Sequence, residues 1–285
     1  MRPIDRWLAV GVVACWAGTL VLVKQGIGEM PPMLMSMMRF ALVAALVVPF
    51  TRVSRRHIPW LLLVSFTFGT VHFGLLFIAL SLAEVGTSAV LVQLGAPMAS
   101  LLACLAFREP LGLARAFGLA LTVVGVFVLA QGPSFPGLLP LALLIVSAAG
   151  WAVTNLIVKV MPPIDAMALT GWSSLFCVPQ LALAALLFEG NPLPHLAAAG
   201  WHGWSAVIYS AVVSSVMAYG VWYWLLARNP VSAIVPYSML NPVMTIGLGV
   251  LVVGESIPLL KIAGTALILG GVLIVIMQKR PAVAR

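Results

Sequence analysis

The chain has 285 residues, of which 62% are hydrophobic and 8% are charged, and its formal net charge at pH 7 is +8. A soluble domain carries about 25% charged residues, so this composition excludes an ordinary water-soluble fold and indicates that lipid is the solvent. The apolar runs are about 20 residues long and lack the alternating polarity of barrel strands, which argues against a transmembrane β-barrel.

Hydrophobic runs broken by proline, glycine and charge predict ten membrane-spanning helices in an all-α integral membrane protein. The apolar run that starts near Arg6 continues through Cys15 to Val23 without a small-residue cleavage site, so we expect the first helix to remain uncleaved. The expected helices are 6–25, 33–51, 59–81, 85–107, 112–131, 137–159, 165–188, 203–227, 231–253 and 258–278.

The connections between these helices are short, and the longest one, residues 189–202, is expected at the membrane interface. With both termini in the cytoplasm, the cytoplasmic segments hold twelve of the fifteen basic residues. This bias supports ten spans, in a bacterial-type inner membrane, and explains the net charge without a nucleic-acid partner. The twelve are Arg2, Arg6, Arg52, Arg55, Arg56, Arg108, Arg115, Lys159, Arg228, Lys279, Arg280 and Arg285.

The two halves of the chain, residues 1–132 and 133–285, resemble each other. Each half is expected to contain five helices, and this odd number makes the second half enter the membrane from the opposite side. Inverted repeats are typical of alternating-access transporters, with the site near the midplane between the repeats, although an inert duplicated scaffold is the alternative. The matches are Trp16 and Lys24 with Trp151 and Lys159, Trp60 and Ser88-Ala89 with Trp204 and Ser232-Ala233, Pro97 with Pro242, and Glu109, Gly118 and Gly125 with Glu255, Gly264 and Gly271.

Two prolines interrupt helices at corresponding positions of the halves. Pro97 and Pro242 lie well inside the fourth and ninth helices, where a proline removes a hydrogen bond and bends the chain. Such paired interruptions indicate the lining of a binding site, and a simple packing kink is the alternative.

His72 lies near the centre of the third helix. An ionisable group at that depth is costly and tends to face a cavity, where it could bind solute or a proton. The alternative is a neutral histidine bonded to a backbone carbonyl.

Aromatic and polar side chains share helix faces near mid-membrane in four helices. A set of this kind predicts a pocket with apolar walls and a few polar anchors, between helices 1, 3, 4, 6, 8 and 9. Interhelical hydrogen bonding is the alternative for each residue alone. The faces pair Trp16 with Thr19, Gln93 with Pro97, Trp151 with Thr154 and Asn155, and Tyr237 with Asn241.

Three further features are expected to be structural. The long side chain of Arg39, six residues into the second helix, is expected to reach the interface rather than a substrate. Gly118 and Gly125, like Gly264 and Gly271, are seven residues apart and predict close packing of the fifth and tenth helices. The cysteines, Cys15, Cys104 and Cys177, are expected to be small buried hydrophobes.

The sequence contains no buried carboxylate for an ion relay, no glycine-rich phosphate loop and no cluster with metal-ligand spacing, because all seven acids fall at helix ends or in loops. No cofactor and no metal are therefore expected, and no catalytic constellation is visible.

The repeat, the segments Cys15-Trp16 and Gly150-Trp151, and the segments Phe107-Arg108-Glu109-Pro110 and Gly254-Glu255-Ser256 resemble the EamA family of the drug/metabolite transporter superfamily. The family's pattern is a small residue and a proline in helix 4 or 9, followed by a glutamate at the helix end. This resemblance covers essentially the whole chain and implies a ten-helix, inverted-repeat metabolite exporter. Within the family, His72 and Trp151 look most similar to the YddG-type exporters of aromatic and other amino acids.

We therefore expect a secondary transporter that exports small organic metabolites, above all amino acids, by alternating access at a midplane cavity. The alternatives are an exporter of another metabolite or drug-like solute, a membrane-embedded lipid-modifying enzyme, and a structural subunit. The expected partners are the solute and the lipid bilayer, and the sequence leaves the oligomeric state open, a monomer included.

Overall fold

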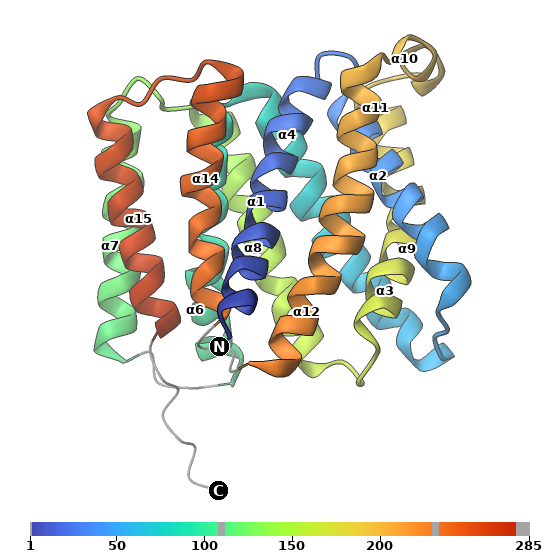
Figure 1. Ribbon diagram of the computed structural model, residues 1–285, viewed down its shortest axis with the longest axis horizontal. Coiled ribbons are helices and arrows are strands. Elements are labelled where there is room, and N and C mark those ends of the chain that lie inside the picture. The colour runs from blue at the N-terminus through green and yellow to red at the C-terminus, as the bar shows by residue number, and fades with distance from the viewer. Residues whose placement is uncertain (1, 108–111, 230–233, 278–285) are drawn as a thin grey trace, which may run out of the picture.

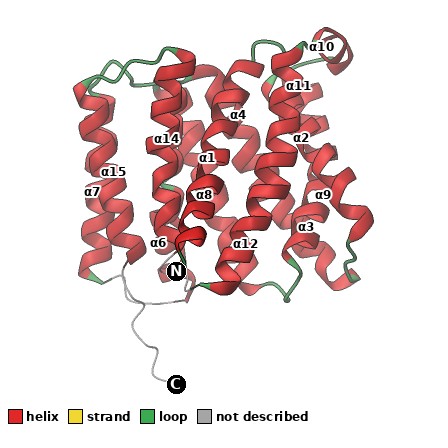
Figure 2. Ribbon diagram, viewed as in Figure 1, coloured by secondary structure: helices red, strands yellow, loops and turns green. Residues whose placement is uncertain are grey.

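The computed structural model describes residues 2–107, 112–229 and 234–277, and in these ranges every regular element is a helix (Figures 1 and 2). The helix α1 begins and α15 ends at the same end of the bundle (Figure 1). The α-helices are α1 (Pro3–Gly26), α2 (Pro32–Val47), α3 (Ile58–Val64), α4 (Leu75–Leu82), α5 (Val85–Val92), α6 (Gly95–Phe107), α7 (Leu113–Ala130), α8 (Leu138–Val160), α9 (Ala166–Phe188), α10 (Pro192–Ala198), α11 (Trp201–Ile208), α12 (Tyr219–Arg228), α14 (Leu240–Leu248) and α15 (Leu259–Met277). The 3₁₀ and π segments are η1 (Val48–Phe50), η2 (Arg55–His57), η3 (Ser65–Gly74), η4 (Tyr209–Ala218), η5 (Val235–Met239) and η6 (Gly249–Val253).

Nine helical stretches of the described chain are long and apolar enough to cross a membrane, which agrees with nine of the ten expected spans. The ninth expected helix, 231–253, is represented by the shorter apolar stretch Tyr237–Val253. Its first residues fall outside the described ranges, as do Arg108-Glu109-Pro110, Ser232-Ala233 and the C-terminal basic residues of the sidedness argument. The connection expected over 189–202 contains the helix α10.

Two of the spans contain long π-helical stretches. The stretch η3 lies in the middle of the third span and η4 in the middle of the eighth, and each has ten residues. They begin 144 residues apart, which is also the separation of Trp60 from Trp204 in the sequence repeat. A π turn is uncommon and occurs often at functional sites. The matching positions of η3 and η4 therefore support the repeat and indicate that the middle of these two spans is a candidate functional region.

The two glycine stripes pack against each other, as the sequence predicts. A methyl group added to Gly118 would lie 2.7 Å from the carbonyl oxygen of Gly271, and one added to Gly125 would lie 2.9 Å from that of Gly264. The backbones of α7 and α15 are therefore in direct contact, which only glycine permits. The residue numbers run in opposite directions along this contact, so the two helices are antiparallel.

Carboxylates from distant parts of the chain cap three helices that have no side-chain cap of their own, at the end of the bundle opposite the N-terminus (Figure 1). A helix N-terminus leaves backbone N–H groups without partners and carries partial positive charge, so a carboxylate stabilises it. Each of these bonds ties one loop to a helix elsewhere in the bundle. Glu189 accepts from Met33 N and Leu34 N (2.7 and 2.9 Å), Glu255 from Val85 N and Gly86 N (the latter 3.1 Å), and Glu29 from Gly203 N (2.7 Å).

Two lysine ammonium groups make further bonds at this end of the bundle. Lys261, which is 1% exposed, lies 2.8 Å from Glu84 and 3.4 Å from Glu255. Lys24 donates to the carbonyls of Leu80 and Ala83 at 2.6 and 2.8 Å, where α4 ends. The acids and bases expected at helix ends thus make several separate bonds, and those of Glu29, Glu189 and Lys261 join the first half of the chain to the second.

The Glu29 carboxylate makes one of these links sensitive to pH. The N–H of Gly203, and then the side chain of His202 at 2.8 Å, hold the pKa of Glu29 below its ordinary value of 4.5. A depressed folded-state pKa contributes stability that is present above the ordinary pKa and is lost as the pH falls through the folded value. We expect Glu29→Gln to lower the melting temperature at pH 7, and the difference from the native chain to shrink below about pH 4. A difference that stays constant over this range in thermal scans would show that the link does not depend on charge.

Candidate functional site

The fourth expected helix is interrupted at Gln93 and Leu94. The N–H groups of these two residues bond to carbonyls three residues back, both at 3.1 Å, and α6 begins at Gly95. Pro97 has no N–H, so the carbonyl of Gln93 lacks its usual helical donor and accepts from Ala96 N at 3.2 Å instead. The bend that the sequence predicts is therefore a break in the helix, located just before the proline.

The ninth expected helix has the same kind of interruption. The 3₁₀ segment η5 ends at Met239, and α14 begins at Leu240, two residues before Pro242. The side-chain amide Nε2 of Gln93 lies 4.0 Å from Sδ of Met239, a weak acceptor. The two broken helices thus touch at their breaks. Discontinuous helices in corresponding positions are a feature of transporter binding sites.

The indole of Trp151, on α8, lies directly against the first of these breaks. A methyl group added to Gly95 would lie 2.9 Å from Cε3 of Trp151 and 3.1 Å from the carbonyl oxygen of Ala148. A methyl group added to Gly150 would lie 3.3 Å from the backbone nitrogen of His72. Two glycines, one on each side, therefore allow α8 to approach both α6 and η3.

His72 is 5% exposed, and its ring is held by the backbone and side chain of one serine. Nδ1 lies 3.0 Å from both the carbonyl oxygen and Oγ of Ser147, and that hydroxyl donates to the carbonyl of His72 at 2.8 Å. A carbonyl only accepts, so in the neutral ring Nδ1 carries the proton and Nε2 is the acceptor. The ring also stacks on Phe68 at 5.6 Å and meets Phe73 edge-on at 4.7 Å. The contact with a carbonyl matches the alternative weighed for this residue, and its role in binding solute stays a prediction.

Trp16 and Tyr237 belong to a second aromatic and aliphatic cluster, around α1 and α12. The Trp16 ring lies 5.0 Å from that of Tyr219 and 5.1 Å from that of Trp222. Its Nε1 is buried and has no hydrogen-bond partner. An unpartnered buried N–H is unusual in a native structure and marks a place where a ligand or water could bind.

The two asparagines of the predicted set bond within their own helices. Nδ2 of Asn155 donates to the carbonyl of Trp151 at 2.7 Å, and its residue is exposed. Oδ1 of Asn241 accepts from Oγ1 of Thr245 at 3.0 Å. The predicted residues therefore form two groups, one around Trp151 and the other around Trp16, and the central cavity between them stays a prediction.

Arg39 corrects one interpretation of the sequence. The side chain was expected to extend to the interface, but the residue is 2% exposed and its guanidinium bonds to Ser215. The reason is that α2 is covered on this side by η3 and η4, so the route to the headgroups is blocked by protein. The hydrophobic periodicity of the sequence did not indicate that Arg39 is buried against protein, although an arginine within an apolar run is itself a signal of function.

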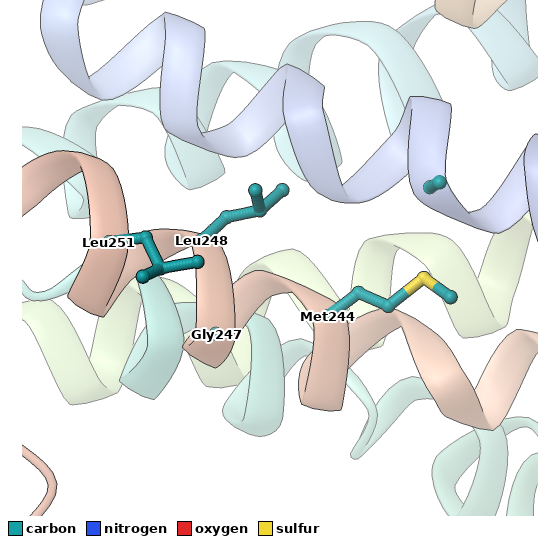
Figure 3. Close-up of a pocket in the computed structure, with 5 residues that line it drawn as sticks. Met244, Gly247, Leu248 and Leu251 are labelled. Atoms are coloured by element: carbon teal, nitrogen blue, oxygen red, sulfur yellow. The ribbon is translucent and has the colours of Figure 1, made fainter.

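A shallow apolar cavity of about 280 Å³ lies between α1 and the α14–η6 helix. Figure 3 shows the side chains of Met244, Leu248 and Leu251 on one helix, with Gly247 between them. Ala14 completes the lining, which contains no polar side chain and none of the predicted site residues. Binding sites for charged solutes need convergent polar groups, so this cavity fits a lipid chain better than a metabolite.

In the described residues, no three histidine, cysteine or acidic side chains gather as metal ligands, and all three cysteines are free. Two of them, Cys104 and Cys177, are buried.

The chain matches the model of the EamA-like transporter family twice, over residues 6–131 and 138–277. The chain belongs to this family. An EamA-like transporter is not an enzyme, so the lipid-modifying alternative is rejected.

Relatives of this EamA-like transporter cover nearly its whole length. A protein of Salmonella typhimurium described as a probable amino-acid metabolite efflux pump is 30% identical over 96% of this chain and 95% of its own. One of Escherichia coli with the same description is 28% identical over the same shares. A crystal structure with 20% identity matches 96% of both chains with a TM-score of 0.63, which shows a common fold.

Proposed function

We propose that this transporter exports amino acids or closely related small metabolites by alternating access, with the solute bound where the two broken helices meet. The observation that carries the proposal is the contact between the breaks, Gln93 against Met239, with Trp151 seated on Gly95 beside them. Transporters commonly bind their solutes near mid-membrane, where helices are broken at corresponding positions of two halves. The names of the two bacterial relatives support the choice of amino acids.

The proposed site combines apolar walls with a small number of polar groups. The indole of Trp151, the ring of Phe68 and the imidazole of His72 supply flat apolar surfaces, and the amide of Gln93 supplies a donor and an acceptor. This mixture suits a solute with an aromatic or aliphatic side chain and a polar backbone. In this proposal the concentration gradient of the solute supplies the energy for export, and proton coupling through His72 is the second candidate for the energy source.

The two-half organisation is part of the proposal. Equivalent π stretches, antiparallel glycine stripes and a family model that matches twice all support halves that divide near residue 132. Arg52 lies between the second and third spans, Arg55 and Arg56 begin the third, and Arg2 lies before the first. Their placement supports cytoplasmic termini in the inner membrane.

The network around Glu255 and Lys261 would act at the outer end. It ties the start of α5, from the first half, to Glu255 before α15 and to Lys261 in the first turn of α15, from the second half. An outward opening between the halves must separate these partners. The proposed transport cycle therefore includes breaking and remaking this network.

The test is uptake of a panel of labelled amino acids into proteoliposomes. We expect Trp151→Ala to weaken apparent affinity at least about tenfold, or about 1.4 kcal/mol, because the indole forms one wall of the proposed site. Trp201→Ala, at a tryptophan that is 78% exposed at the start of α11, is the matched control and should leave uptake unchanged.

Gly95→Ala provides a second test, because the added methyl displaces the same indole without removing it. If none of the amino acids moves into vesicles with folded protein, the proposed substrate class is wrong and the family membership still holds. Uptake that is equally reduced by Trp201→Ala would show that the effect of Trp151→Ala is not specific to the site.

A further inference from the structure

Arg39 is a buried cation among aromatic rings. Its guanidinium carbon lies 3.9 Å from the centre of the Phe73 ring, with the rings of Phe40 and Phe77 at 5.4 and 5.9 Å. A charge in such surroundings is costly unless an anion accompanies it. No ion pair of the described residues includes Arg39. The protein thus carries a positive charge in its membrane core that none of these pairs balances.

One arm of the guanidinium has no hydrogen-bond partner. Nε and Nη2 donate to Oγ of Ser215 at 3.3 and 3.0 Å, and this hydroxyl donates its own hydrogen to the carbonyl of Ser210 at 2.8 Å. Ser215 is thereby oriented to accept, and it fixes the guanidinium in place. Nη1, which is buried, has no partner at all. Its two N–H groups are therefore held in a fixed direction and left to bind something else.

A second unpartnered polar group lies on the same side of α2. Ser36 is three residues before Arg39, so the two side chains share a helix face. Ser36 is fully buried, and its hydroxyl has no hydrogen-bond partner. Buried polar groups are almost always satisfied, so two such groups on one face indicate a partner of their own that carries acceptor atoms.

Arg39 is also part of the surroundings of the proposed site. Phe73, which lies under the guanidinium, is the next residue after His72, and the two rings are 4.7 Å apart. Phe73 belongs to η3 in the first half of the chain and Ser215 to η4 in the second half. The guanidinium therefore contacts both η3 and η4, the two π stretches that occupy equivalent positions in the halves. In the proposed cycle the two halves move relative to each other at this contact.

We propose that Arg39, through Nη1, binds the carboxylate of the transported solute. This proposal rests on the proposed function and deepens it, because it names the chemical group that the site selects. A carboxylate supplies the missing negative charge and accepts charge-assisted hydrogen bonds, which are stronger than neutral ones. The rings of Phe40 and Phe73 provide an apolar surface beside it for the side chain of the solute. Solutes that lack the carboxylate, such as amines and amides of the same shape, leave Arg39 unbalanced and are excluded.

The experiment uses the purified full-length chain and four probes of similar shape: L-phenylalanine, 3-phenylpropionate, L-phenylalaninamide and phenethylamine. Thermal stabilisation by each probe is measured in detergent, and uptake is measured in proteoliposomes. The variants are Arg39→Met, Arg39→Lys and, as a matched control, Arg228→Met, at an exposed arginine that lies 4.2 Å over the Trp224 ring. We expect the two carboxylates to stabilise the native chain and the amide and amine not to. Arg39→Met should weaken the response to the carboxylates at least tenfold, and Arg228→Met should leave it unchanged.

The outcomes separate this proposal from the proposed function. Equal responses of the native chain to the acid and its amide overturn the role of Arg39, even where amino acids are transported. Stabilisation by 3-phenylpropionate that Arg39→Met abolishes, without transport of any amino acid, supports the carboxylate site and removes amino acids as substrates. Stabilisation by chloride alone, with no preference for the carboxylates, identifies a fixed inorganic anion and overturns the proposal. Where Arg39→Met does not fold, the comparison of acid with amide in the native chain and in Arg39→Lys decides the question.

Discussion

Replacement of Lys261 by methionine is expected to destabilise the protein by about 3–5 kcal/mol, because it leaves the buried carboxylate of Glu255 and the partly exposed one of Glu84 without this counter-charge. Lys261 is 1% exposed and lies close to both Glu84 and Glu255. Without the ammonium group, two negative charges face each other at the end of the bundle. We expect a melting temperature lower by on the order of 10 °C in size-exclusion thermal assays.

Two companion variants show whether charge is the cause. Glu255, at 5% exposed, is the more deeply buried acid, so Glu255→Gln added to Lys261→Met should recover part of the lost stability. Arg52→Met, at an exposed arginine near the opposite end, should change little. If Lys261→Met had the same melting temperature as the native chain, the network would contribute no stability. The role proposed for the network at the outer end would then lose its basis.

A methyl group at Gly271 and one at the adjacent Gly270 are expected to act in opposite directions. At Gly271 the new carbon would lie 2.3 Å from Oγ1 of Thr122 and 2.5 Å from the carbonyl oxygen of Gly118. The backbone of α7 must then move away, at a cost of about 1–3 kcal/mol. At Gly270 the nearest atom, on Leu121, is 3.8 Å away, which is ordinary contact.

Gly270→Ala therefore serves as the matched control for Gly271→Ala. It should leave the melting temperature unchanged or raise it slightly, since alanine favours a helix over glycine by about 1 kcal/mol. Both variants are neighbours in one helix and add the same methyl group, so a difference between them reports only the contact with α7. Equal melting temperatures would contradict the close packing of the two helices.

The sequence predicts the spans and the glycine contact well because both depend on local signals. Hydropathy over about 20 residues finds a helix in lipid whatever its neighbours, and a stripe such as Gly264 with Gly271 is readable because small residues matter only where helices touch. The interruption at Pro97 was predicted for the same reason, since the missing N–H is a property of one residue.

Features that depend on distant partners could not be predicted in this way. Glu189 caps a helix that begins more than 150 residues earlier, and nothing around either residue indicates the pairing. Burial also raises the pKa of Glu189 above its ordinary value, although two backbone N–H groups bond to it. Arg39 was misplaced because its short distance from the helix end suggested that its side chain could reach the interface, whereas the packing of η3 and η4 decides its surroundings.

The glycine contact between α7 and α15 has a consequence for the ancestry of the chain. Thr122 approaches Gly271 and Ile268 approaches Gly125, so each helix offers the other the same arrangement in reverse order. A surface of this kind complements itself, and a protein of half the length could have formed it between two copies inserted in opposite orientations. Joining the copies in one gene frees the two sides to diverge, and here α7 has the polar Thr122 at the position where α15 has the apolar Ile268.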